Sequence, residues 1–168
     1  MKKTVMIICI LLCVLLLALS IYLYSRNTLK GTLKFYSQIM MDIPDDVHLK
    51  IYYINPRILT RIPLSAEELM VFRGVKVITI ESEELAKHST LLRKLDASII
   101  SAVNEESYIN ARLYYVFETG NGNKFLEVII NEINGPVFVN GYEVESDPIF
   151  YEIIVPFLSE EDRIILGI

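Results

Sequence analysis

Residues 111–131 read ARLYYVFETGNGNKFLEVIIN, which is two runs of β-branched and aromatic residues around a short segment of glycine and asparagine. The runs have the composition of strands, and glycine and asparagine tolerate the positive φ angles that a tight connection requires. We therefore predict an antiparallel hairpin whose strands cover Ala111 to Glu118 and Lys124 to Asn131.

The segment that follows carries a second hairpin signal. Short apolar runs over 137–139 and 142–144 flank the dipeptide Asn140-Gly141. A type I′ turn needs positive φ at both of its central positions, and Asn-Gly meets this need. The pattern predicts two short paired strands.

A helix is predicted after this second hairpin, with Asp147 as its N-cap and Pro148 at its first position. Its apolar positions recur as adjacent pairs four residues apart: Ile149, Phe150, Ile153, Ile154, Phe157 and Leu158. They form one stripe that we expect to pack on the sheet, and Pro156 should kink the helix or close it near Val155. The acidic run 160–162 is expected to precede a short tail.

Two strands and a short helix are predicted ahead of the central hairpin. The strands cover His48 to Ile54 and Val75 to Ile80, both rich in β-branched and aromatic residues. Between them, Ser65 and Glu68 have the spacing of a capping box, in which each side chain binds a backbone amide near the other residue. This box predicts a helix from Ala66 to Phe72.

A further helix is expected after the second of these strands. Ser82 is its candidate N-cap, and one face carries four leucines: Leu85, Leu91, Leu92 and Leu95. The helix either continues through Ile99 and Val103 or breaks at residues 96–98, which read Asp-Ala-Ser. Both possibilities stay open.

These elements make residues 42–168 one α+β domain. Its 127 residues suffice for a single hydrophobic core and are too few for two. Because tight hairpins join the strands, we expect an antiparallel sheet in two layers, with helices packed on one face and the other face left to solvent.

Residues 1–25 form a separate N-terminal segment. From Thr4 to Ser25 there are twenty-two uncharged residues, enough at about 1.5 Å per helical residue to cross a hydrocarbon core of about 30 Å. A signal-peptidase site is available at residues 18–20, but the apolar run is longer than a usual signal and continues to Tyr24. A retained transmembrane anchor, which contacts the bilayer through residues 4–25, is favoured over a cleaved signal.

The charges beside this run are balanced. Lys2, Lys3 and the amino terminus lie before it, and Arg26, Lys30 and Lys34 lie after it. We place the amino terminus inside because a short basic head ahead of an apolar run is the usual form of an export signal. The domain is then expected outside the cytoplasm, at the cell envelope.

Residues 26–41 are expected to be a juxtamembrane linker. Lys30 and Lys34 stand four residues apart, which fits a helix that continues from the anchor. The alternation over residues 28–34 fits a short strand equally, and Gly31 weakens a helix. Either conformation agrees with the pattern.

A long apolar helix that leads into an α+β domain is also the arrangement of type IV pilins. This chain departs from their pattern in two places. No acidic residue lies near the start of the apolar run, and no processing site with a small residue followed by an aromatic one precedes it. No family is assigned.

The domain is acidic. The chain holds sixteen Lys and Arg, of which Lys2 and Lys3 precede the apolar run, so fourteen stand against twenty-one Asp and Glu. A protein that neutralises phosphates needs a basic face, so this balance argues against nucleic-acid binding.

Common catalytic and cofactor motifs are absent from the sequence. It holds no Gly-x-Ser-x-Gly, no His-Glu-x-x-His, no Gly-x-x-x-x-Gly-Lys and no EF-hand loop. The two histidines, His48 and His88, make a poor zinc site without a cysteine in the domain, and His88 lies on the packed side of its helix. We therefore assign no catalytic residue, cofactor or metal.

Three side chains are candidates for a binding surface: Tyr52, Tyr115 and Glu127. Neighbouring strand residues point to opposite faces, so each doubled tyrosine, at 52–53 and 114–115, sends one ring outward. Rigid amphipathic rings are common at interfaces. A simple register across the central hairpin places Glu127 opposite Tyr115, and the simplest interpretation of Glu127 is a position on the solvent side of the sheet.

We expect a single-pass membrane protein whose domain has a non-enzymatic binding or accessory role toward a protein partner. Two other classes stay open: an enzyme that acts on an envelope polymer through Glu127 or Asp96, and a membrane-held immunity or inhibitor protein that binds a basic partner. Clustered buried carboxylates in a deep cleft would favour the enzyme. A flat tyrosine-bearing patch or an open sheet edge would favour binding.

Overall fold

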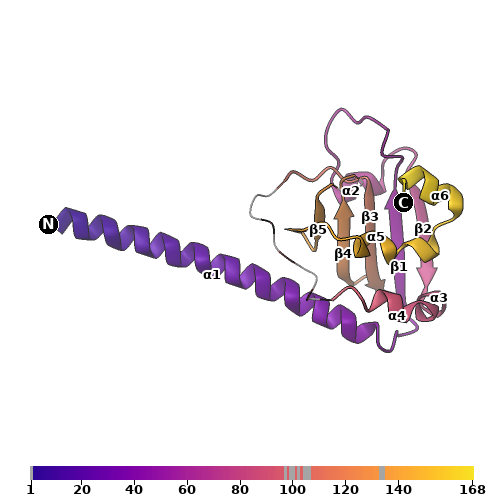
Figure 1. Cartoon of the computed structure of the whole chain (residues 1–168), viewed down its shortest axis with the longest axis horizontal. Coiled ribbons are helices and arrows are strands. Elements are labelled where there is room, and N and C mark those ends of the chain that lie inside the picture. The colour runs from indigo at the N-terminus through magenta and orange to yellow at the C-terminus, as the bar shows by residue number, and fades with distance from the viewer. Residues whose placement is uncertain (1, 97, 99–100, 102, 104–106, 133–134) are drawn as a thin grey trace.

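The computed structural model contains one antiparallel sheet with helices on both sides and a first helix that projects away from it (Figure 1). It describes residues 2–96, 98, 101, 103, 107–132 and 135–168. The strands are β1 (Val47–Tyr53), β2 (Lys76–Glu81), β3 (Leu113–Thr119), β4 (Lys124–Ile130), β5 (Val137–Val139) and β6 (Tyr142–Val144), in the sheet order β2-β1-β3-β4-β5-β6. The helices are α1 (Lys2–Ile39), α2 (Ala66–Met70), α3 (Ser82–Lys87), α4 (Ser89–Leu92), α5 (Ile149–Glu152), the 3-10 helix η1 (Val155–Phe157) and α6 (Glu160–Leu166). The predicted α+β class is confirmed.

Both predicted hairpins are confirmed. β3 pairs with β4, and β5 pairs with β6 around Asn140 and Gly141. These two turn residues have φ angles of 48° and 83°, which is the backbone that a type I′ turn requires.

The register of the central hairpin differs from the prediction. Glu127 lies opposite Val116, and Tyr115 lies opposite Val128. The cause is a β-bulge, because the pairing shifts between Phe117 and Glu118 and leaves one extra residue on β4. A shift of one residue moves a side chain to the other face of a sheet, so Glu127 and Tyr115 lie on opposite faces.

Two helix starts in the middle of the chain were predicted, and one of them is correct. The amide of Glu68 donates to Ser65 Oγ at 3.2 Å and the amide of Ser65 donates to Glu68 Oε2 at 2.8 Å, so the capping box of α2 is confirmed. Ser82 is not a cap, because its hydroxyl donates to the carbonyl of Asp45 at 3.0 Å. The helix after Ser82 breaks at His88 into α3 and α4.

The alternative in which that helix continues through Ile99 and Val103 is wrong within the described residues. Helix α4 ends at Leu92, and Val103 is not helical. Ile99 lies outside the described residues.

The C-terminal helix is shorter than its apolar stripe suggested. Asp147 Oδ1 accepts from the amide of Ile149 at 2.9 Å, as a capping side chain does, but the helix begins at Ile149 with Pro148 as its N-cap, one residue later than predicted. The helix ends at Glu152, and Pro156 lies in η1. The acidic run that was expected to precede a tail instead opens α6.

The second part of α1, which we define as residues 27–39, packs on the sheet and belongs to the domain. Helix α1 runs unbroken to Ile39, so the strand alternative for residues 28–34 is wrong. Three side chains on one side of this part, and that of Met40 directly after the helix, are buried in the core: Leu29, Leu33, Tyr36 and Met40. The Tyr36 ring packs edge-on against Phe117 at 5.1 Å between centroids, and its hydroxyl donates to the carbonyl of Leu92 at 3.1 Å.

The first part of α1 extends away from the sheet (Figure 1). The side chains of residues 10–17 are exposed, and all of them are apolar. Over the residues whose side chains the structure describes, no helix combines the length and the apolar character that a membrane crossing needs.

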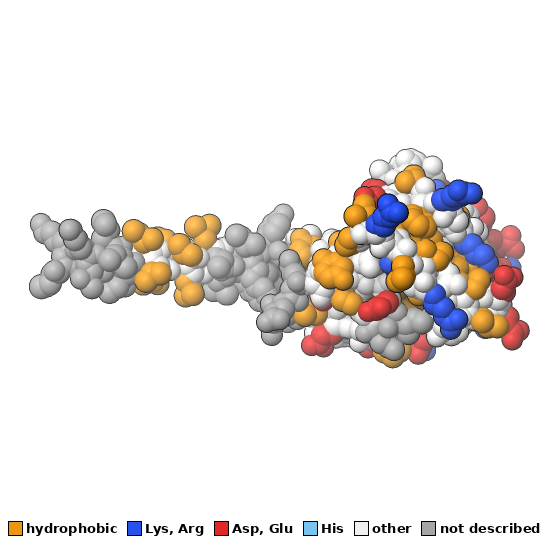
Figure 2. Space-filling model, turned by 90° about the horizontal axis from the view of Figure 1, so that it is seen from above, with side chains coloured by type: hydrophobic (Ala, Val, Ile, Leu, Met, Phe, Trp, Pro, Cys, Tyr) orange, Lys and Arg blue, Asp and Glu red, His pale blue; other side chains and the backbone are white. Residues whose placement is uncertain are grey.

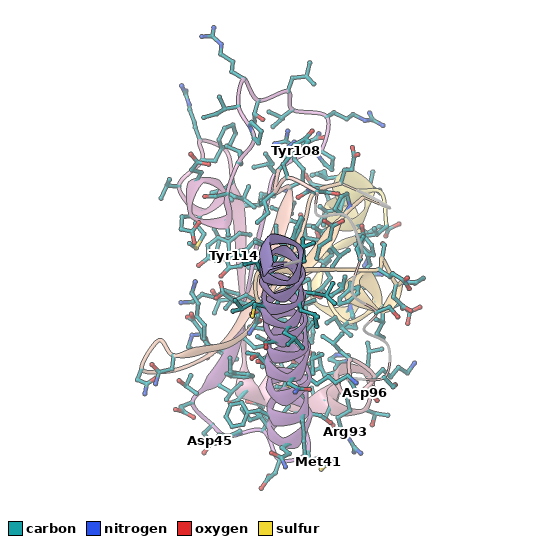
Figure 3. All side chains as sticks on the ribbon, turned by 90° about the vertical axis from the view of Figure 1, so that its left-hand side faces the viewer. Met41, Asp45, Arg93, Asp96, Tyr108 and Tyr114 are labelled. Carbon is teal, nitrogen blue, oxygen red and sulfur yellow. The ribbon has the colours of Figure 1, made fainter. Side chains whose placement is uncertain are left out.

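The sheet has apolar side chains on both faces, so the prediction of helices on one face is wrong. One face, which we call the α1 face, packs against the second part of α1 and against α3 to α6. The other, which we call the α2 face, packs its Tyr114, Ile129 and Phe138 against Ala66 and Leu69 of α2. Figure 3 shows α2 on one side of the sheet and the yellow C-terminal helices on the other. Strands β3 to β5 are apolar at nearly every position, so both faces of the sheet are apolar and one helical layer cannot cover them.

Candidate functional site

The three predicted surface residues do not lie together. Tyr115 is fully buried on the α1 face, where its hydroxyl donates to the carbonyl of Phe150 at 3.0 Å. Its ring therefore contributes nothing to the surface, and burial raises the pKa of its phenol well above the usual value. Tyr52 and Glu127 lie on the α2 face, where Tyr52 stacks on Tyr114 with 5.7 Å between ring centroids.

Glu127 belongs to a small polar cluster at the margin of the α2 face. The Tyr114 hydroxyl donates to Glu127 Oε2 at 2.5 Å, and Lys124 Nζ lies 3.1 Å from each of these two oxygens. Glu127 keeps a third of its side chain exposed to solvent. Burial raises the pKa of Tyr114, and the hydrogen bond to Glu127 raises it further. The phenol therefore stays protonated and acts as a donor, which excludes it as a general base.

A second polar group lies further along the same face. Burial alone would raise the pKa of Glu118, but hydrogen bonds from Lys50 at 2.5 Å and from His48 at 2.9 Å outweigh it and lower the pKa. His88 packs the edge of its ring against Phe157 at 5.1 Å, at the boundary of the core as predicted. Among the described residues, no group of three or more His, Cys, Asp or Glu side chains could hold a metal ion.

The carboxylates of the enzyme hypothesis are not assembled into one site. Figure 3 places Asp96 and Tyr114, the partner of Glu127, on opposite sides of α1. Asp96 accepts from the amide of Ser98 at 2.6 Å, and Ser98 lowers the pKa of its carboxyl. Paired acids for glycoside or peptide hydrolysis need to flank one substrate bond, and these two do not.

The most unusual surface lies on the loop between β1 and β2. We call it the arginine loop surface and define it as residues 57–62 and 71–73. Leu59 is 96% exposed, Val71 84% and Ile62 62%. Three arginines stand beside these apolar side chains, and none of them makes an ion pair within the described part of the chain: Arg57, Arg61 and Arg73. Figure 2 views this end of the domain and shows basic and apolar side chains next to each other.

The loop is held at both ends, which leaves only its tip displayed. At its start, the amide of Arg57 donates to Asn55 Oδ1 at 2.9 Å. At its end, Leu64 is buried on the α2 face and its carbonyl accepts from Ala111 at 2.8 Å. In the middle, Thr60 Oγ1 accepts from Arg112 at 3.1 Å. A fixed loop with an exposed apolar tip and arginines has the composition that protein interfaces favour.

Sequence reasoning missed this surface. The signal that was available is the run RILTRI over residues 57–62, which is apolar and basic between two prolines. The run has neither the period of a strand nor that of a helix, so no helix or strand was predicted there. Comparison with protein-family models, with curated proteins and with solved structures finds no match for this chain. The function has to be inferred from the molecule alone.

Proposed function

We propose that this chain is a single-pass membrane-anchored binding protein, whose domain lies outside the cytoplasm and presents the arginine loop surface to an acidic protein partner. The observation that carries the proposal is the exposed, basic and apolar loop on an otherwise acidic domain. Charged groups of opposite sign on the two partners speed encounter and select the partner, and apolar side chains such as Leu59 supply buried area.

The continuity of α1 supports the proposed anchor. Residues Thr4 to Ser25 carry no charge and cover about 33 Å at the rise of an α-helix. The same helix continues into the core from Leu29 on. The large apolar side chains of residues 10–17 are favourable in lipid and costly in water. A rigid helix that joins the bilayer to the sheet also fixes how the domain stands on the membrane.

A fractionation experiment tests the anchor. The tagged full-length protein should migrate at its uncut mass and stay with membranes in carbonate or high salt, because its buried apolar length outweighs any screened charge. Release of a soluble fragment that begins at Ile21 would show a cleaved signal instead.

The orientation can be tested by thiol labelling in intact cells. The sequence has cysteines only at Cys9 and Cys13, both in α1, so the unsubstituted chain is the control. Asn121→Cys places a thiol in the exposed β3–β4 loop and should react with an impermeant reagent. Labelling of Asn121→Cys only after lysis would reverse the orientation.

The partner surface can be tested by photo-crosslinking in cells. A photoreactive residue in place of Leu59 should give a discrete crosslinked product that Arg61→Glu removes. The matched control is Ile164, an apolar residue on α6 that is 74% exposed. The same products from both positions would show random collisions and would contradict the proposal.

A further inference from the structure

The outer strand β2 has an unprotected edge. Within the described part of the chain it pairs with β1 alone, and the sheet ends there. Its residues read KVITIE, so the charged side chains stand at the two ends and the middle is entirely β-branched. Edge strands usually carry a charge, a proline or a bulge that prevents further pairing. Residues 77–80 contain none of these.

A groove of about 460 Å³ runs along this edge. Four consecutive residues of β2, 78–81, line it, and since their side chains alternate between the faces, the groove follows the strand itself. Opposite them stand Pro156 and Phe157 of η1. In Figure 1, β2 forms the margin of the sheet that lies away from α1.

The charges of the groove are unequal. Three carboxylates line it, from Glu81, Glu83 and Glu84, against one amine, from Lys87. Lys87 already pairs with Glu84 at 2.7 Å and with Glu83 at 3.8 Å. The groove therefore keeps an excess of negative charge beside an apolar wall.

We propose that β2 accepts an extended segment of another protein as an added strand, and that this segment alternates apolar residues with lysine or arginine. Backbone hydrogen bonds to the free edge hold such a strand, and pockets for alternate side chains select its sequence. One set of its side chains lies in the groove against Ile78, Ile80 and Phe157. The basic residues of the segment lie near the carboxylates of Glu81, Glu83 and Glu84.

A second copy of this chain fits the edge less well. The two-fold axis that relates two antiparallel edge strands stands perpendicular to the sheet. Figure 1 shows that α1 runs across the strands and away from β2, so this axis would point the two α1 helices in opposite directions. Two chains anchored in one membrane, as proposed above, cannot pair in this way.

The test uses the full-length protein in detergent micelles and a fluorescent eight-residue peptide that alternates valine with lysine. Binding is followed by fluorescence anisotropy. Ile78→Lys places a charge in the groove and should raise the Kd at least tenfold. Tyr108→Lys is the control, because Tyr108 is 72% exposed and does not line the groove, and it should change the Kd less than twofold. An equal loss in both variants would show plain charge attraction and would overturn the proposal.

A second measurement needs no substituted protein, so its result does not depend on whether a variant folds. Hydrogen exchange of the unsubstituted protein should slow at least tenfold at amides within residues 77–80 when the peptide is present, because new backbone hydrogen bonds protect them. A peptide that alternates valine with glutamate should give no protection. Unchanged exchange in β2 would overturn the proposal, and so would a peptide-free dimer that Ile78→Lys dissociates, since the edge would then belong to a second copy.

Discussion

The two faces of the sheet differ in what covers them. The α1 face is packed by the second part of α1 and by α3 to α6, and its buried side chains are apolar or aromatic. The α2 face is packed by a helix of five residues and a loop, and beyond them it carries Lys50, Glu118 and Glu127 in hydrogen-bonded pairs. The α1 face therefore holds the fold together, whereas the α2 face and its loop are free to carry function.

The largest effect is expected when the α1 face loses its helix. A chain that starts at Asp42 lacks Leu29, Leu33, Tyr36 and Met40, all buried. Truncating one such side chain costs about 2–5 kcal/mol. Losing all four should therefore cost as much as the whole free energy of unfolding of an ordinary domain, which is about 5–15 kcal/mol. We expect no cooperative thermal transition by circular dichroism.

The control is a chain that starts at Asn27, which keeps these four residues and lacks the projecting apolar part. It should melt cooperatively. If the chain that starts at Asp42 melts at the same temperature, the second part of α1 is not part of the folded domain and the comparison of the two faces loses its basis.

A point substitution on the α1 face should cost somewhat less. Ile153 is fully buried, so Ile153→Asp would remove its apolar contacts and place an unpaired carboxylate among apolar groups. We expect a loss of several kcal/mol, about 4, in the free energy of unfolding by urea. Glu152 is its exposed neighbour, and Glu152→Lys should stay within about 0.5 kcal/mol. Equal effects at both positions would mean that α5 does not pack on the sheet.

Acid should weaken the contact between Asp162 of α6 and Tyr53 of β1, which closes one margin of the α1 face. Hydrogen bonds from Tyr53 and Ser159 hold the pKa of Asp162 well below its ordinary value, and Lys76 at 3.0 Å adds to them. A carboxyl whose pKa is lower in the folded than in the unfolded state stabilises the fold above the unfolded pKa of about 3.9. This contribution is lost as the pH falls from there toward the folded pKa.

The prediction is checked by urea unfolding between pH 7 and pH 2.5. Asp162→Asn should lower the stability at pH 7 and should flatten its fall below pH 4. Glu161→Gln is the control, because that side chain is 80% exposed, and its pH profile should match that of the unsubstituted chain. An unchanged slope in Asp162→Asn would assign the acid sensitivity to other carboxylates, with Glu118 of the α2 face as the next to test.

Strands and turns were predictable because their signals are local. The strands of both hairpins alternate or carry β-branched runs, and Asn140-Gly141 specifies its turn by backbone angles alone. The capping box at Ser65 is equally local, since its two hydrogen bonds span three residues. The same capping-box spacing occurs at Ser159 and Asp162, where no helix was predicted, and it begins α6 in the structure.

Features that depend on tertiary packing were not predictable. The bulge near Phe117 has no marker in the sequence, yet it decides which face carries Glu127. Leu29 and Leu33 fit a helix or a strand equally until the sheet is there to bury them. The arginine loop surface has no period at all, so only the fixed ends of the loop reveal that Leu59 is displayed.

The smallest predicted effect compares two neighbouring tyrosines on opposite faces. Tyr114→Phe on the α2 face removes a hydroxyl from Glu127, which keeps Lys124 at 3.1 Å and remains partly exposed to water. We expect a cost of about 1 kcal/mol, the net value of one ordinary hydrogen bond. Tyr115→Phe on the α1 face removes the donor to the carbonyl of Phe150, and no water reaches the fully buried Tyr115 side chain to replace it. An acceptor left without its partner in the interior costs about 1–3 kcal/mol, so the loss should be the larger of the two. Both are measured by urea unfolding of the chain that starts at Asn27. A larger loss for Tyr114→Phe would mean that the polar cluster on the α2 face stabilises the fold more than the buried contact on the α1 face, which would contradict the proposed difference between the two faces.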